Sequence, residues 1–292
     1  MDTGRARRGR AGDRRRRLGQ HFLAPGGAVE RVVEAIAPRR GERFLEVGPG
    51  RGAITWPLLA AGVRPLAVEI DPALVRRLRQ IPDASAEFTV VRGDILKVDL
   101  PELLDRELPP GRGIRAVGNL PYSVASPAIL RFLSLPERFT DLTLMVQREV
   151  ADRILSPPGT RDYGVLTLLC ACRALPSRLL DLSPGCFQPP PEVRSTLLRF
   201  TPRPPLFPSE EGFATFAAVV KAAFSSRRKR IRNSLSAGAA LSTPQTEAWL
   251  RSAGLDPAAR PEEIPLEGYL ELARHLPEGP RGPVRRPRDP AN

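Results

Sequence analysis

A short apolar segment that runs into a glycine-rich turn constrains the fold of this chain more than any other feature. The turn, Gly48-Pro49-Gly50-Arg51-Gly52, lies between a predicted strand over residues 44–47 and a predicted apolar helix over residues 54–61. Glycines adopt backbone conformations that a side chain would forbid, and they let the backbone approach a ligand closely. The segment therefore predicts an α/β fold with a ligand site at this turn.

Segments with strand and helix periodicity alternate along the first half of the chain. Beyond the first unit, strands are expected over residues 66–70, 88–91, 114–117 and 142–146, and helices over 29–36, 73–80, 127–133 and 148–155. Such alternation predicts a parallel, doubly wound sheet. Residues 166–172 and 196–200 are expected to close the sheet as two further strands.

Composition shifts divide the chain into five parts. Residues 201–209 contain four prolines, which make a stiff extended linker, and apolar residues keep helical spacing after it. We therefore expect an α/β domain over 18–201, a linker over 202–209 and a small all-helical domain over 210–276. The basic arm 1–17 and the Pro-rich tail 277–292 are expected to be disordered when free.

Positive charge is the strongest compositional signal. The 292 residues carry a net charge of +13, and only three of the 45 basic residues are lysine. The charge is clustered, with eight arginines over residues 5–17, and six basic residues without an acid over residues 212–246. A basic protein with such clusters is typical of those that bind nucleic acid.

Cysteine, histidine and apolar residues exclude several classes of protein. Three cysteines make neither a disulfide framework nor a zinc site, and they fit a reducing cytosol. Two histidines, His21 and His275, leave no metal cluster to propose. No apolar run approaches the ~20 residues of a membrane helix, and no apolar stretch follows the charged N-terminus. We expect a cytoplasmic protein without a membrane span.

Three acidic residues accompany the glycine turn. Glu46 lies two residues before Gly48, Glu69 ends the next strand and can accept both hydroxyls of a ribose, and Asp94 follows the third strand, where it can meet an adenine amine. A dinucleotide fingerprint fits loosely through Gly48, Gly50 and Ala53, and a structural turn is a third possibility. Glu46 together with Gly52 favours an S-adenosylmethionine site.

The segment Asn119-Leu120-Pro121-Tyr122 directly follows a central strand, where ligands bind in open α/β sheets. The Asn119 amide oxygen and the Leu120 carbonyl can together accept both hydrogens of an exocyclic amine. Pro121 stiffens the turn, and Tyr122 can stack on a base. The alternative is a tight turn with a surface tyrosine.

Two further segments carry candidate functions. Phe187 precedes three prolines, Pro189 to Pro191, and it offers a second aromatic face opposite Tyr122, unless it belongs to the core. The second segment is predicted to begin a helix whose dense positive charge contacts phosphates, although an ordinary solvated surface is the alternative. Its basic residues are Arg227, Arg228, Lys229, Arg230 and Arg232.

In these motifs the chain resembles the small-subunit ribosomal RNA adenine N6,N6-dimethyltransferases, the KsgA family. The resemblance covers roughly three quarters of the sequence and rests on G-Q-H-F-L, E-V-G-P-G-R-G, N-L-P-Y, F-Q-P-P-P-E-V-R-S and R-R-K-R-I-R-N-S-L, in that order. It implies a Rossmann-like class I S-adenosylmethionine-dependent methyltransferase domain followed by a small all-helical domain. The implied reaction dimethylates N6 of two adjacent adenines near the 3′ end of 16S rRNA in an immature 30S subunit, by a monomer without a metal.

The resemblance also implies roles for individual residues. The cofactor is expected to contact His21, Leu23, Gly48, Gly50, Glu69, Ile70, Asp94, Ile95 and Asn119. The target adenine is expected to contact Asn119, Leu120, Pro121, Tyr122 and Phe187. The chain departs from the family at His21, where many members carry Asn, and at Glu192-Val193-Arg194, where Lys-Val-Asp is usual.

Other functions are left open at this point. Relatives that methylate a large-subunit rRNA adenine and confer macrolide resistance favour N-I-P-Y, so Leu120 and the three prolines favour the small-subunit enzymes. A non-catalytic RNA-binding relative would bind S-adenosylmethionine without methylating 30S particles. A dehydrogenase would bind NAD instead.

Overall fold

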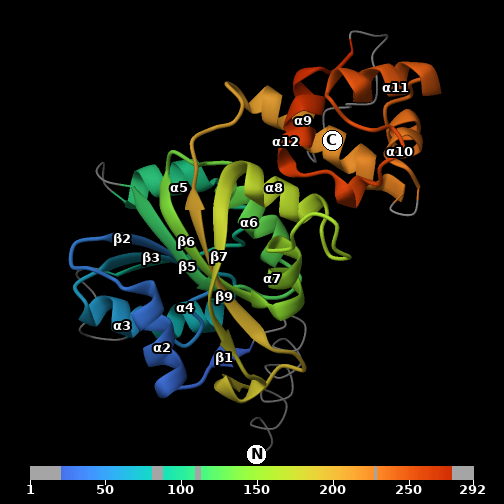
Figure 1. Ribbon diagram of the computed structural model, residues 1–292. Helices are drawn as coiled ribbons and strands as arrows, with labels where there is room; N and C mark the ends of the chain where they lie inside the picture. The colour runs from blue at the N-terminus through green and yellow to red at the C-terminus, as the bar shows by residue number, and fades with distance from the viewer. Residues whose placement is uncertain (1–20, 81–87, 109–112, 227–228, 278–292) are drawn as a thin grey trace, which may run out of the picture. The chain divides into compact units, whose positions relative to one another are not determined.

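The computed structural model describes residues 21–80, 88–108, 113–226 and 229–277. The chain splits into two compact units, Met1–Ala151 with Leu175–Pro202, and Asp152–Ala174 with Arg203–Asn292. The first unit is an α/β sheet structure and the second is helical (Figure 1). The two ends of the chain that are expected to be disordered lie outside the described residues, apart from Pro277.

A seven-stranded sheet forms the centre of the first unit. Its order is β4-β3-β2-β5-β6-β9-β7, in which β2 to β6 pair in parallel and β9 runs antiparallel to β6. The predicted parallel, doubly wound sheet is therefore confirmed. The strands are β2 (Arg43–Val47), β3 (Arg64–Glu69), β4 (Thr89–Arg92), β5 (Ile114–Asn119), β6 (Phe139–Gln147), β7 (Ala174–Leu182) and β9 (Ser195–Pro202).

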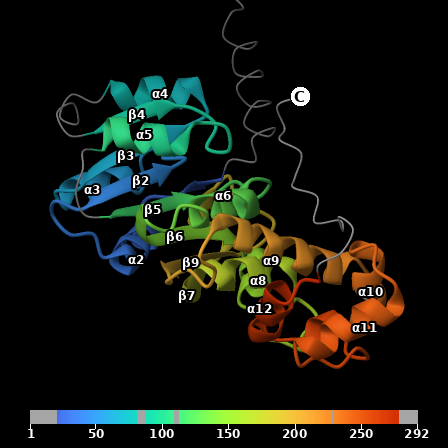
Figure 2. The same ribbon diagram turned by 90° about the horizontal axis from the view of Figure 1, so that it is seen from above.

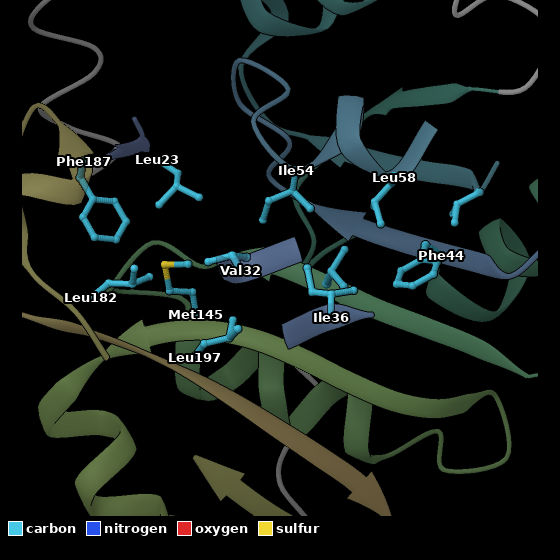
Figure 3. Packing of buried hydrophobic residues seen from close by; sticks show 12 residues of the cluster. Leu23, Val32, Ile36, Phe44, Ile54, Leu58, Met145, Leu182, Phe187 and Leu197 are labelled. Carbon is cyan, nitrogen blue, oxygen red and sulfur yellow. The ribbon is translucent and has the colours of Figure 1, made fainter. Parts of the chain in front are cut away.

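Both faces of the sheet are covered, as continuous apolar strands require. Residues of β2, β5, β6 and β9 pack on one face against α2 and α3 in the cluster drawn in Figure 3, with Phe44, Met145 and Leu197 among them. Their neighbours on the opposite face are fully buried too: Leu45, Ala116, Leu144 and Leu198. The helices are α2 (Gly27–Ile36), α3 (Thr55–Ala60), α4 (Pro72–Arg79), α5 (Leu100–Glu107), α6 (Ala125–Leu133) and α7 (Arg148–Ile154).

A second, two-stranded sheet ties the start of the described chain to a late loop. The strand β1 (Phe22–Leu23) pairs antiparallel with β8 (Phe187–Gln188), and Leu23 lies opposite Phe187. We had not predicted either strand, because two residues are too short for a periodic pattern. Leu23 and Phe187 anchor the pair in the hydrophobic cluster of the large sheet (Figure 3).

The second unit is helical but begins earlier in the chain than we predicted. Residues 152–174 belong to it rather than to the α/β unit. The reason is packing: α8 contacts α9 and α12 (Figure 2), and the Tyr163 hydroxyl donates to the Ile264 carbonyl at 3.0 Å. The helices of this unit are α8 (Val165–Arg173), α9 (Glu210–Ala223), α10 (Ile231–Gly238), α11 (Thr243–Ser252) and α12 (Leu266–Arg274).

The predicted strand over residues 166–172 is wrong, because this segment forms α8. Leu166, Leu168, Leu169 and Cys170 are all buried, so the helix is apolar on several sides. A short, continuously apolar segment has no period that distinguishes a buried strand from a buried helix. The strand at this edge of the sheet is instead β7, which begins directly after α8.

A buried arginine joins elements at the end of the sheet away from the glycine turn. The Arg115 side chain on β5 donates to Asp141 at 2.7 Å and to Glu42 at 2.8 Å. It also donates to the carbonyl oxygens of Ile36 at 2.6 Å and Ala37 at 3.2 Å, which end helix α2. One side chain therefore holds α2, β5 and β6 together.

Replacing this arginine should destabilise the protein strongly. Arg115→Ala removes the cation that pairs with two carboxylates and the donor to two helix carbonyls, so we expect the free energy of unfolding to fall by about 3–5 kcal/mol in urea denaturation. Arg106→Ala is the matched control, because Arg106 forms exposed ion pairs with Glu102 and Glu107 and should change little. Equal stability of the two variants would contradict this role of Arg115.

Candidate active site

A cavity lies at the carboxyl ends of the parallel strands, around the point where the strand order reverses. The strands β3 and β4 extend from β2 on one side, and β6 extends from β5 on the other, so the reversal lies between β2 and β5. Open α/β sheets bind ligands at this position. The lining includes every residue predicted to contact the cofactor or the adenine: His21, Leu23, Gly48, Gly50, Glu69, Ile70, Asp94, Ile95, Asn119, Leu120, Pro121, Tyr122 and Phe187.

The glycine turn brings bare backbone to the cavity wall. Gly48 and Gly50 have φ angles of 66° and 59°, a region in which side chains are rarely found. A Cβ atom on Gly50 would also lie 2.8 Å from the Phe22 ring. The sequence needs glycine at position 50 both for its conformation and for the close approach of β1.

Two acidic side chains are buried behind this turn. Glu69 accepts hydrogen bonds from the backbone nitrogens of Gly50 at 3.1 Å and Asp71 at 2.8 Å, while burial raises its pKa. Glu46 accepts a hydrogen bond from the Thr55 hydroxyl at 2.7 Å. Burial, together with the nearby charge of Glu69, raises the pKa of Glu46 to about 7.

A third acid and two isoleucines lie farther along the same wall. Asp94 follows β4, and its side chain accepts a hydrogen bond from the Leu96 nitrogen at 3.0 Å, which fixes the turn. Ile95 is buried, whereas Ile70 is 43% exposed, an unusual fraction for a large apolar side chain in this protein. A carboxylate beside apolar side chains suits a flat aromatic ring that carries a hydrogen-bond donor at its edge.

Asn119 is held in one orientation by the start of the described chain. Its side-chain nitrogen donates to the His21 carbonyl oxygen at 2.7 Å. A carbonyl oxygen can only accept, so the nitrogen must face His21, and Oδ1 remains available as an acceptor. The next residue is fixed as well, because the Leu120 nitrogen donates to the Met145 carbonyl at 3.1 Å.

His21 and Tyr122 form an aromatic wall. Their rings stack with centroids 5.5 Å apart and an interplanar angle of 26°. The His21 Nδ1 atom lies 2.9 Å from the Pro189 carbonyl oxygen, so it carries the donated proton. Burial raises the pKa of Tyr122, an effect that nearby Ser195 partly offsets.

Phe187 combines the two roles that the sequence left open. It is 4% exposed and belongs to the hydrophobic cluster with Leu23 and Leu182 (Figure 3). It nevertheless lines the cavity, as does Tyr122.

The sequence did not single out Phe22 or Ser195 as site residues, although both line the cavity. For Phe22, the only indication in the sequence of a role in the site is that it directly follows His21.

Within the described residues, the basic segment enters a helix later than predicted, since only Arg232 lies inside it. Helix α10 begins at Ile231, so Lys229 and Arg230 precede it, and both are exposed. Ile231 is fully buried and its nitrogen donates to the Ala259 carbonyl at 2.8 Å, which fixes the helix start. Arg232 pairs with Glu247 at 2.8 Å. Arg227 and Arg228 lie outside the described residues.

The described residues contain neither a membrane-spanning helix nor a metal cluster. None of the helices within them is long and apolar enough to cross a membrane. No group of three or more His, Cys, Asp or Glu side chains in the described ranges could hold a metal ion.

Comparison with known proteins gives a consistent set of relatives. The family model for ribosomal RNA adenine dimethylases matches residues 12–277. The ribosomal RNA small subunit methyltransferase A of Bordetella pertussis is 41% identical over 264 residues, which cover 90% of this chain and 94% of the relative. The protein of the same name from Pseudomonas aeruginosa is 37% identical, with 91% and 96% covered.

Two solved structures share the fold over most of the chain. A dimethyladenosine transferase from Plasmodium falciparum has a TM-score of 0.69 at 21% identity, covering 86% of this chain and 96% of that one. The 23S rRNA methyltransferase ErmE has a TM-score of 0.63 at 26% identity, covering 87% and 99%. The predicted methyltransferase fold is thereby confirmed.

The buried Glu46 should make stability depend on pH. Its folded-state pKa of about 7 exceeds the ordinary value of 4.5, so the folded protein binds a proton that the unfolded chain releases between these values. Stability is therefore lost as pH rises through this window. Relative to Glu46→Gln, the free energy of unfolding of the ligand-free wild type should fall by up to about 3 kcal/mol between about pH 5 and 8. Urea denaturation at several pH values measures this difference, and a difference independent of pH would contradict the prediction.

Proposed function

This chain belongs to the ribosomal RNA adenine dimethylase family, and on that premise we propose that it transfers methyl groups from S-adenosylmethionine to N6 of two adjacent adenines near the 3′ end of 16S rRNA. The observation that carries the proposal is the orientation of Asn119. Its amide nitrogen donates to the His21 carbonyl oxygen. The amide oxygen is therefore free to accept a hydrogen bond from an amine in the cavity that Glu69 also lines.

The residues of the cavity fit S-adenosylmethionine. Gly48 and Gly50 bring backbone without side chains to the cavity wall for the methionine part, and Glu69 offers carboxylate oxygens for the ribose hydroxyls. Asp94 would accept from the adenine amine while Ile70 and Ile95 cover the ring. His21, Leu23 and Asn119 would close the opposite side. When bound, the cofactor supplies an electrophilic methyl group.

The side chains around Asn119 would prepare the target amine. The lone pair of an adenine amine is delocalised into the ring, which makes the nitrogen a poor nucleophile. Hydrogen bonds from the amine to Asn119 Oδ1 and the Leu120 carbonyl would favour a pyramidal nitrogen and stabilise its developing positive charge. Pro121 would keep the carbonyl aimed, while Tyr122 and Phe187 would stack on the flipped base. Water can take the proton that is released.

The helical unit would bind rRNA by its charge. Lys229 and Arg230 are exposed beside the start of α10, so they are available to contact phosphates. Arg227 and Arg228 extend the same basic segment, and Arg232 would contribute at its end. The substrate would be an immature 30S subunit in the cytoplasm, approached by a monomer.

Methylation assays on separated ribosomal subunits test which subunit is the substrate. Incubation of the protein with labelled S-adenosylmethionine and either immature 30S or immature 50S particles should label 30S particles only. Mapping should then place two methyl groups on each of two adjacent adenines near the 3′ end of 16S rRNA. Labelling of 50S particles would favour a large-subunit enzyme like ErmE, which is 26% identical to this chain. Cofactor binding without labelling would favour a non-catalytic RNA-binding protein.

Two variants of Asn119 test the mechanism. Asn119→Ala removes one of two acceptors for the amine, which should reduce single-turnover methyl transfer by ~10²–10³-fold. Asn119→Asp keeps an acceptor oxygen but loses the donor to His21, so we expect it to be impaired as well. Circular dichroism serves as the folding control, and calorimetry should show that binding of S-adenosylhomocysteine is weakened but measurable. Near wild-type transfer by Asn119→Ala would contradict the mechanism.

A further inference from the structure

Arg51 is a cation in a cavity whose other charged walls are acidic. The acidic residues Glu46, Glu69 and Asp94 all line the cavity. Among the described lining residues, Arg51 is the one lysine or arginine. Within the described part of the chain it makes no ion pair. We expect a positive charge in this position to bind an anion.

The Arg51 side chain is exposed, and it lies over the aromatic ring that packs against the glycine turn. Its guanidinium carbon lies 4.7 Å from the centroid of the Phe22 ring, within the range of a cation–π contact. The same ring packs against Gly50, where an added Cβ atom would lie 2.8 Å from Phe22 Cδ1. Phe22 therefore connects Arg51 to the backbone that we assign to the methionine part of the cofactor.

We propose that Arg51 binds the carboxylate of the methionine part of S-adenosylmethionine; this inference rests on the proposed function. The cofactor carries two positive groups, its sulfonium and its ammonium, and one negative group, its carboxylate. The acidic lining favours the two positive groups but repels the carboxylate. A guanidinium matches a carboxylate with two parallel N–H donors, which gives both charge and geometry.

His21 does not fill this role. It also lines the cavity, but its Nδ1 proton is donated to the Pro189 carbonyl and its ring stacks on Tyr122. An RNA phosphate is the other anion that could reach Arg51, since the side chain is exposed. The stack on Phe22 and the position directly after Gly50 favour the carboxylate. The phosphate becomes an outcome of the test.

Two ligands that differ in the amino-acid part isolate the contact. S-adenosylhomocysteine has the carboxylate, whereas 5′-methylthioadenosine has the same nucleoside and sulfur without it. By calorimetry, Arg51→Gln should weaken binding of S-adenosylhomocysteine by about five- to twentyfold and leave 5′-methylthioadenosine within about twofold. Arg51→Lys should recover part of the loss. Arg76→Gln, which removes an exposed arginine from α4, is the control for net charge and should bind both ligands like the wild type.

The other outcomes overturn the proposal. Equal loss of both ligands in Arg51→Gln would mean that the side chain only supports Phe22 and the turn. Unchanged binding of S-adenosylhomocysteine, with a lower salt dependence of 30S binding, would assign Arg51 to an RNA phosphate. If the wild type binds neither ligand, the proposed function fails together with this inference. If the wild type binds both and the variant matches it, this inference alone fails.

Discussion

The hydrogen bond from the Asn119 amide to the His21 carbonyl is the contact on which the site depends. It is 2.7 Å long, and it joins the first described residue to the end of the central strand β5. From His21 the same segment reaches the Pro189 loop, stacks on Tyr122 and lays Phe22 against Gly50. Two consecutive residues, His21 and Phe22, therefore link the proposed adenine pocket to the proposed cofactor turn.

The sheet topology explains why these two halves meet. The glycine turn follows β2 and Asn119 ends β5, and the two strands are parallel neighbours, with Val47 opposite Gly118. A Cβ atom on Gly118 would lie 2.6 Å from the Val47 carbonyl oxygen, so a larger residue would disturb this approach. The close approach of the two halves of the proposed site thus rests on main-chain contacts between β2 and β5, while the proposed charges and aromatic rings come from segments that these strands position.

Much of the site could be predicted because its residues follow strands that have clear patterns. Glu69 lies at the end of one predicted strand and Asn119 directly after another, and parallel strands bring their carboxyl ends to one edge. Tertiary context decided the rest. The apolar segment of α8 has no period that separates helix from strand. Arg230 precedes α10 because the buried Ile231 fixes where that helix begins, which charge density alone does not indicate.

A crystal structure of this protein bound to S-adenosylhomocysteine would test the central claim most directly. The account predicts the ribose hydroxyls at the Glu69 carboxylate and the sulfur on the side of Asn119 and Tyr122. It also predicts that the Asn119 nitrogen still donates to the His21 carbonyl. A ligand bound away from Glu69, or an Asn119 amide turned so that its nitrogen faces the cavity, would contradict the account.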